Sequence, residues 1–283
     1  MLNSDSCFQH FFLINTLNLK KESLLWKFNR PNESKTHYLL GTMHVSSEEA
    51  YAPVTASKHY MEQCQIYAGE MDLNDPDLAN IGDYFLNEDN ITLNEIIGDK
   101  KYSKYKKIIS KAYGIDLDQI AHFLPMVISN MISESILTKT YDLALDHFLW
   151  NYAMALNMEM NGLESAADQF HIMQSIPLEE QLKALKACIK NVSKFRQKVL
   201  KLSELYKNGA LSKLYKTSKK SMGGLRKLMI YDRNEHMTQR LIELTSEGAV
   251  FCAVGAAHLA GGKGMIRLLK KEGFKIKPIM IRD

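Results

Sequence analysis

The chain has 283 residues, of which 46% are hydrophobic and 24% are charged, and its 36 Lys and Arg against 32 Asp and Glu give a net charge of +4. This composition excludes a disordered, a collagen-like and a disulfide-scaffold protein. The four cysteines, Cys7, Cys64, Cys188 and Cys252, stand far apart and form no C-x-x-C pair, so the sequence encodes neither a zinc ribbon nor a redox dithiol.

A transmembrane protein is also excluded, because the sequence has no run of about 18 apolar residues. The apolar residues 11–14 near the N-terminus follow Asp5 and precede the first basic pair, Lys20 and Lys21, which makes a poor signal peptide. We therefore expect a cytoplasmic protein, or a periplasmic or secreted one if the start of the chain conceals a leader.

The first elements predicted along the chain are two short strands, residues 24–28 and 36–40. The polar stretch between them is rich in turn formers, which favours a hairpin. Residues 52–64 have helical character, and residues 65–71 form the next strand, which ends in acidic residues. We expect residues 1–22 to be an N-terminal extension of one α/β domain, residues 23–283.

A large helical insertion is predicted between about residues 102 and 230. Apolar residues in the stretch 118–135 recur with the spacing of a helix that packs on a core. A short strand follows at residues 158–163, and Pro177 opens a second long helical region that extends to about Lys227.

The second helical region is strongly basic. Between Lys190 and Lys227 the chain has 12 Lys and Arg but one acid, Glu204, a net charge of +11; the 24 basic and 31 acidic residues elsewhere sum to −7. One interpretation is a solvated helical face. The other is a surface that contacts an anionic polymer, a phosphate-rich ligand or a membrane.

The C-terminal part predicts a strand–helix–strand unit. A helix runs from Asn234 to about Glu247, and residues 249–254 form a buried strand. A glycine-rich loop leads to a helix over residues 265–271 and a last strand over residues 274–280, an order typical of a parallel crossover. The fold class is therefore α/β: a mixed central β-sheet with flanking helices and a large helical insertion in the middle of the chain.

Two of the predicted strands end in the same pattern, in which a histidine follows a glycine by three residues: Gly41 with His44, and Gly255 with His258. Glu70 lies at the end of a third strand. Because ligands of open α/β sheets gather at the carboxyl ends of strands, we expect these side chains to converge. Two imidazoles and a carboxylate suit zinc, manganese or iron and leave one coordination position for water.

A structural role for these histidines stays open, since a single histidine at a strand end is commonly just hydrogen-bonded. The H-E-x-x-H and G-x-S-x-G motifs are absent, and the Walker pattern is not met because Gly264 follows Lys263. We expect surface roles for His10, His37 and His59, which occupy the terminus, the hairpin and a helix.

The segments around these residues resemble the TraB/PrgY/GumN family, which includes the TIKI metalloproteases and is distantly akin to erythromycin esterase-like and ChaN-like proteins. The matching segments, in family order, are YLLGTMHV (38–45), IYAGEMDL (66–73), NGLESAADQ (161–169), DRNEHM (232–237) and residues 250–273. The family pattern has two G-x-x-H motifs, a glutamate on the intervening strand, a Gly-Leu-Glu-Ser/Thr segment and an Arg-Asn pair. In this chain these become Gly41/His44, Gly255/His258, Glu70, Glu164 and Arg233/Asn234.

The resemblance implies a metal-dependent peptidase for the TIKI branch, a His/Glu-activated water for the erythromycin esterase relatives, and inhibition of a peptide pheromone for PrgY-like members. We therefore predict a metal-dependent hydrolase of a peptide or another amide or ester. His44, His258 and Glu70 would hold a divalent ion, Mn, Co or Zn. The alternative is a regulatory protein that binds a peptide or cofactor without turnover.

The resemblance also implies catalytic roles for Glu70, Glu164, Arg233 and Asn234. Glu164 would be a further ligand or the general base, and Arg233 would stabilise oxyanion charge. Structural alternatives stay open: Glu164 or Asn234 could cap the helix that follows it, and Arg233 could form an ion pair with Asp232 or Glu70. The helical middle shows no match, and we expect it to determine substrate specificity.

Overall fold

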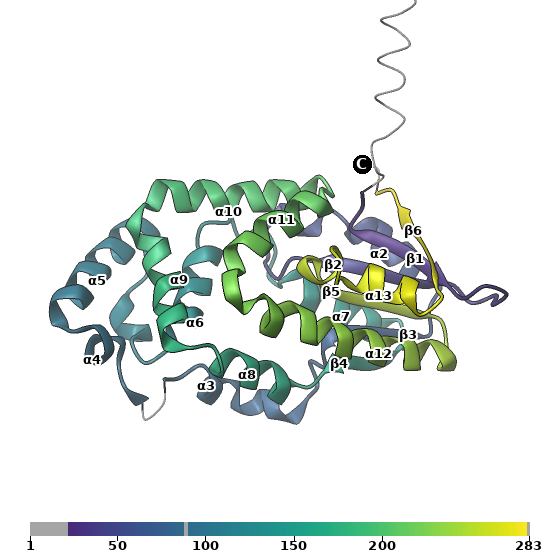
Figure 1. Ribbon diagram of the computed structural model, residues 1–283, viewed down its shortest axis with the longest axis horizontal. Helices are drawn as coiled ribbons and strands as arrows, with labels where there is room; N and C mark the ends of the chain where they lie inside the picture. Colours follow the sequence, from purple (N-terminus) through teal and green to yellow (C-terminus); the bar gives the residue numbers. More distant parts are fainter. Residues whose placement is uncertain (1–21, 88–89, 282–283) are drawn as a thin grey trace, which may run out of the picture.

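The structure is a computed structural model, and it describes residues 22–87 and 90–281 (Figure 1). Cys7, His10 and nearly all of the predicted extension, residues 1–22, lie outside the described residues. Cys64, Cys188 and Cys252 are buried free thiols.

A six-stranded sheet with the order β4-β3-β5-β2-β1-β6 forms the centre of the fold. Its strands are β1 (Leu25–Asn29), β2 (His37–Thr42), β3 (Ile66–Met71), β4 (Glu159–Glu164), β5 (Val250–Gly255) and β6 (Lys275–Ile279). The four strands from β4 to β2 are parallel, whereas β1 is antiparallel to both of its neighbours. This mixed sheet confirms the predicted α/β class.

The last strand lies in a different place from the one that a simple crossover predicts. β6 runs in the same direction as β5 but pairs with β1 at the edge of the sheet, so β2 and β1 lie between them. The predicted hairpin accounts for this, because β1 and β2 occupy the position beside β5. Phe274, just before β6, then packs edge-on against Phe28 of β1 at 5.5 Å between ring centroids.

Helices cover the sheet and form a separate lobe at its far end (Figure 1). The helices are α2 (Val54–Met61), α3 (Ile81–Tyr84), α4 (Leu93–Ile97), α5 (Asp99–Tyr113), α6 (Pro125–Glu134), α7 (Leu145–Ala155), α8 (Ala166–Gln174), α9 (Leu178–Lys190), α10 (Val192–Lys207), α11 (Leu211–Met222), α12 (Asp232–Glu247) and α13 (Met265–Lys271). α7 packs on the face of β3 to which Tyr67 points, while α12 contacts Glu70 on the opposite face. Helices on both faces of the sheet therefore reach the ends of the parallel strands.

The lobe distant from the sheet has its own hydrophobic cluster. It is formed by α4, α5, α6 and α9, with buried side chains such as Leu93, Ile109, Ile128 and Leu185.

The stretch 118–135, predicted as one helix, is divided in two. A 3-10 turn ends at Ile120 and α6 begins at Pro125, because proline suits the first turn of a helix and disrupts its interior.

His37 is buried, and the expectation of a surface position for it was wrong. β2 lies between two strands and all of its residues are buried, so its first residue is covered as well. The His37 ring packs 5.1 Å from the Phe28 ring, and its Nδ1 accepts a 3.2 Å hydrogen bond from Val250 N–H. Burial, aided by nearby Lys35, lowers the pKa of His37 to about 4. The exposed position expected of His59 is confirmed.

Among the described residues, none of the helices combines the length and the apolarity that a membrane span requires. The division into an extension and a single domain stays a prediction.

Candidate functional site

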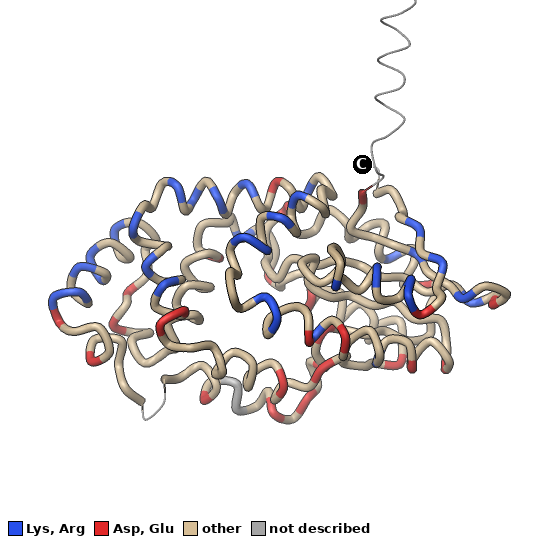
Figure 2. The backbone as a smooth tube through the Cα atoms, in the orientation of Figure 1, with Lys and Arg blue, Asp and Glu red and all other residues tan. Residues whose placement is uncertain are grey.

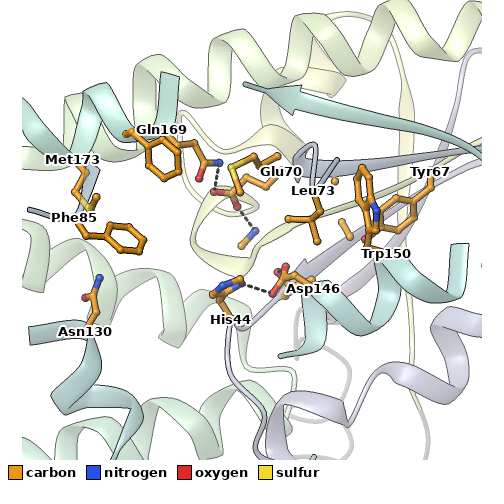
Figure 3. A pocket seen from close by; sticks show the side chains of 16 residues that line it. His44, Tyr67, Glu70, Leu73, Phe85, Asn130, Asp146, Trp150, Gln169 and Met173 are labelled. Carbon is orange, nitrogen blue, oxygen red and sulfur yellow. Dashed lines mark hydrogen bonds and ion pairs between the residues drawn. The ribbon is translucent and has the colours of Figure 1, made fainter. Parts of the chain in front are cut away.

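The carboxyl ends of the four parallel strands meet at one edge of the sheet. β2 leads to His44 and β5 to His258, whereas Glu70 and Glu164 lie at the ends of β3 and β4. A cavity of about 380 Å³ lies at this edge, and His44, Glu70 and Gly255 are among the residues that line it (Figure 3). The parallel strands thus bring side chains from distant segments to one place.

His258 lies in a short 3-10 turn after β5 and is buried. Its Nδ1 is 2.6 Å from Oδ1 of Asn234, whose Nδ2 donates to the carbonyl oxygens of His258 at 3.2 Å and Lys263 at 2.7 Å. Because the amide protons go to carbonyls, Oδ1 is the acceptor and His258 Nδ1 has the proton. Burial lowers the pKa of His258, which favours the neutral ring with a free Nε2.

Arg233, in the first turn of α12, binds both glutamates of the site. Its Nη2 donates to Glu70 Oε1 and Glu164 Oε2, each at 2.6 Å, and its Nε donates to Glu164 Oε1 at 2.9 Å. Gln169 on α8 adds longer hydrogen bonds to both carboxylates, at 3.4 Å and 3.2 Å. Burial opposes the charge on Arg233, but the hydrogen bonds and charges of the two glutamates raise its pKa.

Glu70 is half-buried and ionised. Burial by itself would raise its pKa, but the guanidinium of Arg233 and a 2.8 Å hydrogen bond from Gly255 N–H lower it, as does His258 whenever that ring is protonated. Two carboxylates and one guanidinium leave a net negative charge on this cluster. His258 Nε2 lies 3.9 Å from Glu70 Oε1, next to that charge.

His44 is oriented by a carboxylate from another part of the chain. Its Nδ1 is 2.9 Å from Asp146 Oδ2 in the first turn of α7, and Asp146 Oδ1 accepts a 2.6 Å hydrogen bond from the Thr42 hydroxyl. The His44 side chain is 67% exposed, and its hydrogen bond to Asp146 raises its pKa. The two histidines therefore differ, since a carboxylate holds one and a neutral amide holds the other.

Sequence reasoning missed two polar residues of the site. Asp146 had no signal, because it opens an ordinary helix and belongs to no motif. Gln169 lies inside the matched segment 161–169 but was not selected, and its two contacts with the glutamates become visible only in three dimensions.

The capping alternatives for the two predicted residues were wrong. Ser165 caps α8, since its hydroxyl accepts from Asp168 N–H at 3.1 Å, so Glu164 is free to bind Arg233. α12 begins at Asp232, which places Asn234 inside the helix rather than before it. The alternative of an ion pair between Arg233 and Glu70 is confirmed.

The donor set suits a divalent ion in its chemistry but is not assembled around one point. Each histidine has an Nδ1 held by an oxygen and, within the described residues, an Nε2 without a hydrogen-bond partner, which is the usual arrangement of metal-binding histidines. The 3.9 Å between His258 Nε2 and Glu70 Oε1 exceeds the roughly 3.4 Å that separates two ligands of a tetrahedral zinc ion. Over residues 22–87 and 90–281, no three His, Cys, Asp or Glu side chains are close enough to share a metal ion.

Two comparisons relate the chain to known proteins. The model of the TraB/PrgY/gumN family matches residues 24–278. The metalloprotease TIKI2 of Danio rerio is 21% identical to the chain over an alignment of 322 positions, which covers 90% of this chain and 60% of that protein. The chain thus spans about 60% of the length of the curated relative that it matches.

Proposed function

We propose, from the premise that this chain belongs to the TraB/PrgY/gumN family, that it is a hydrolase of peptide or other amide or ester bonds. The reacting groups would lie around His44, His258 and Glu70. The observation that supports this most is that both imidazole rings are oriented by a hydrogen bond at Nδ1. Each has Nδ1 fixed by an oxygen acceptor and Nε2 left for chemistry, and Nε2 of His258 lies 3.9 Å from the ionised carboxylate of Glu70.

In the site without a metal ion, we assign the imidazole of His258 the task of accepting a proton from the attacking water. Its Nε2 has a free lone pair, and burial keeps the ring neutral. Asn234 positions this ring and holds its tautomer. In the same metal-free site His44, which Asp146 helps to protonate, is suited to donate a proton to the leaving group.

The roles predicted for Arg233 and Glu164 change in this proposal. The Nε and Nη2 of Arg233 already donate to Glu70 and Glu164, so we assign it the positioning of Glu70 rather than the binding of an oxyanion. Both oxygens of Glu164 accept from Arg233, which makes Glu164 part of the same support.

The metal is a further part of the proposal. His44, His258 and Glu70 would hold a divalent ion, Mn, Co or Zn, which when bound would act as a Lewis acid and lower the pKa of water towards neutrality. With the ion bound, the Nε2 atoms of both histidines would be ligands and would not transfer protons, because Nδ1 of each ring is already hydrogen-bonded. The net negative charge of the Glu70–Arg233–Glu164 cluster favours a cation there.

The test is hydrolysis of a mixed peptide pool by the purified protein, followed by mass spectrometry, together with measurement of its metal content. We expect cleavage that a chelator abolishes and that Mn, Co or Zn restores. His44→Ala and His258→Ala should each reduce the rate by about 10² to 10⁴, whereas His59→Ala, an exposed histidine on α2, should have no effect. Unchanged cleavage in both site variants would overturn the proposal.

A regulatory protein that binds a peptide without turnover is the second candidate. The observation in its favour is that the site's charged groups are already paired with one another and that, in the described part of the chain, no three ligands assemble. Saturable binding of a peptide with no product after prolonged incubation would favour it. Cleavage that depends on His258 would rule it out.

For the basic segment, residues 190–227, we propose contact with an anionic surface. Lys194, Lys198 and Lys201 are exposed on successive turns of α10, and the basic residues of α10 and α11 gather on one side of the lobe (Figure 2). Among the described residues, only Lys227 of this segment has a salt bridge. Sedimentation with anionic vesicles at low salt, lost at high salt, is the expected result; binding that persists at high salt would contradict it.

The cytoplasmic location stays a prediction, which cell fractionation tests.

A further inference from the structure

The cavity beside His44 has polar side chains in its middle and an apolar wall on one side (Figure 3). The polar side chains are His44, Glu70 and Asp146, the groups described above. The apolar wall is formed by Phe85, which follows α3, and by Phe170 and Met173 on α8. Figure 3 shows Phe85 and Met173 together, across the cavity from Trp150.

The fold leaves part of this apolar wall open to water. Phe170 is buried, and its ring stacks on Tyr84 at 4.4 Å and meets Phe85 edge-on at 6.1 Å, so it forms a fixed base. Phe85 and Met173 are only half-buried. When an apolar group of a ligand covers such exposed surface in a cavity, both are removed from water, which favours binding.

A second cavity, of about 570 Å³, also has His44 in its wall. His44 lines both cavities, and α6 forms a wall of both, with Asn130 in the first and Met131 and Glu134 in the second. The loop before α7, which lines the second cavity, is fixed to the segment after β2, because Thr140 N–H and Tyr141 N–H both donate to the Ser46 carbonyl. A chain-like ligand at His44 therefore has room in both cavities.

Asn130 gives the first cavity a group that suits a peptide backbone. It is exposed, and Figure 3 shows its amide directed into the cavity between Phe85 and His44. Within the described residues it makes no hydrogen bond through its side chain. A side-chain amide donates and accepts at once, as a peptide group requires of its partner.

We propose that the site takes an internal segment of a polypeptide, with a large apolar side chain against Phe85 and Met173 and with the chain continuing past His44 into the second cavity. This inference rests on the proposed function and specifies its substrate. The apolar wall, α6 and the loop before α7 all belong to parts of the chain outside the two G-x-x-H motifs, as a specificity-determining region should.

The test uses the full chain and short peptides blocked at both ends, in which one internal position is Phe, Leu, Ala or Glu. Mass spectrometry follows cleavage, and fluorescence anisotropy follows binding of the same peptides. We expect kcat/KM and affinity to favour Phe and Leu over Ala by about tenfold or more, the range known for apolar pockets. Peptides that begin or end at the apolar residue should be poorer ligands, because one cavity then stays empty.

Variants of the apolar wall separate pocket effects from folding. Phe85→Ala and Met173→Ala should reduce kcat/KM for the Phe and Leu peptides by about tenfold more than they reduce it for the Ala peptide. The matched controls are Phe195→Ala on α10 and Met154→Ala on α7, which line neither cavity. A loss that is equal for all peptides would show a folding defect in place of a pocket, and would count against the inference.

The outcomes distinguish this inference from the proposed function. Cleavage without any preference for an apolar side chain would overturn the inference and leave the hydrolase intact. Binding that depends on the apolar side chain, without cleavage, would support the inference and contradict the hydrolase. If no peptide is bound or cleaved, both are overturned.

Discussion

His37 should make this protein sensitive to mild acid. The ring is fully buried at the start of β2, and burial lowers its pKa to about 4 from its ordinary value of 6.5. In the unfolded chain it takes up a proton as the pH falls below that ordinary value, while in the folded protein it stays neutral. The unfolded state therefore binds more protons in this range, and stability falls as the pH falls.

The size of the effect follows from the two pKa values. The stability due to a neutral His37 is fully present above pH 6.5 and is lost progressively down to about pH 4. Each pKa unit corresponds to about 1.4 kcal/mol, so the total loss is about 3 kcal/mol. That is a large share of the roughly 5 to 15 kcal/mol that stabilises an average domain.

Urea unfolding at a series of pH values, followed by tryptophan fluorescence, measures this loss. The variant His37→Asn keeps an oxygen that can accept from Val250 N–H but cannot take up a proton. Its stability should be lower than that of the wild type near neutral pH and should depend less on pH in the acid range. His59→Asn on the surface is the control. Parallel curves for the wild type and His37→Asn would refute the reasoning.

Three further predictions concern the site and its supports. Arg233→Leu leaves two carboxylates without their cation and should cost about 3 to 5 kcal/mol in urea unfolding; a wild-type midpoint would contradict this. Asp146→Asn should lower hydrolysis by about 10- to 100-fold through the orientation of His44 while leaving the unfolding midpoint nearly unchanged, and full activity would refute that role. Gly162→Ala forces a Cβ against a neighbouring backbone and should cost about 1 to 3 kcal/mol, whereas Gly224→Ala meets nothing within 4 Å; equal stability of the two would show the contact to be unimportant.

Local sequence patterns were sufficient to predict most of the helices and strands and the positions of the motifs. Strand ends, glycine signals and helical periodicity depend on neighbours in the chain, so residues 66–71 and 250–255 were recognisable as apolar strands that deliver polar residues. The parallel arrangement of these strands then follows from the connections between them. This is why the approach of His258 to Glu70 could be expected before any contact was known.

Only the tertiary structure decided how the charged and polar groups of the site are paired. Asp146 lies 102 residues from His44, and Arg233 lies 69 and 163 residues from the two glutamates that it binds. A hydrogen bond or ion pair depends on separation in space to within a fraction of an ångström, and such separations are set by the packing of α7 and α12 on opposite faces of the sheet.

Burial was likewise decided by strand order. The hairpin pattern by itself is compatible with an exposed His37, because a two-stranded ribbon has open faces and edges. In the folded protein β2 lies between β1 and β5, and the same residue is covered completely. The sequence determined which residues form the strands and their ends, while the neighbours that the fold gives each strand determined which side chains lose water and therefore which of them hold or release a proton.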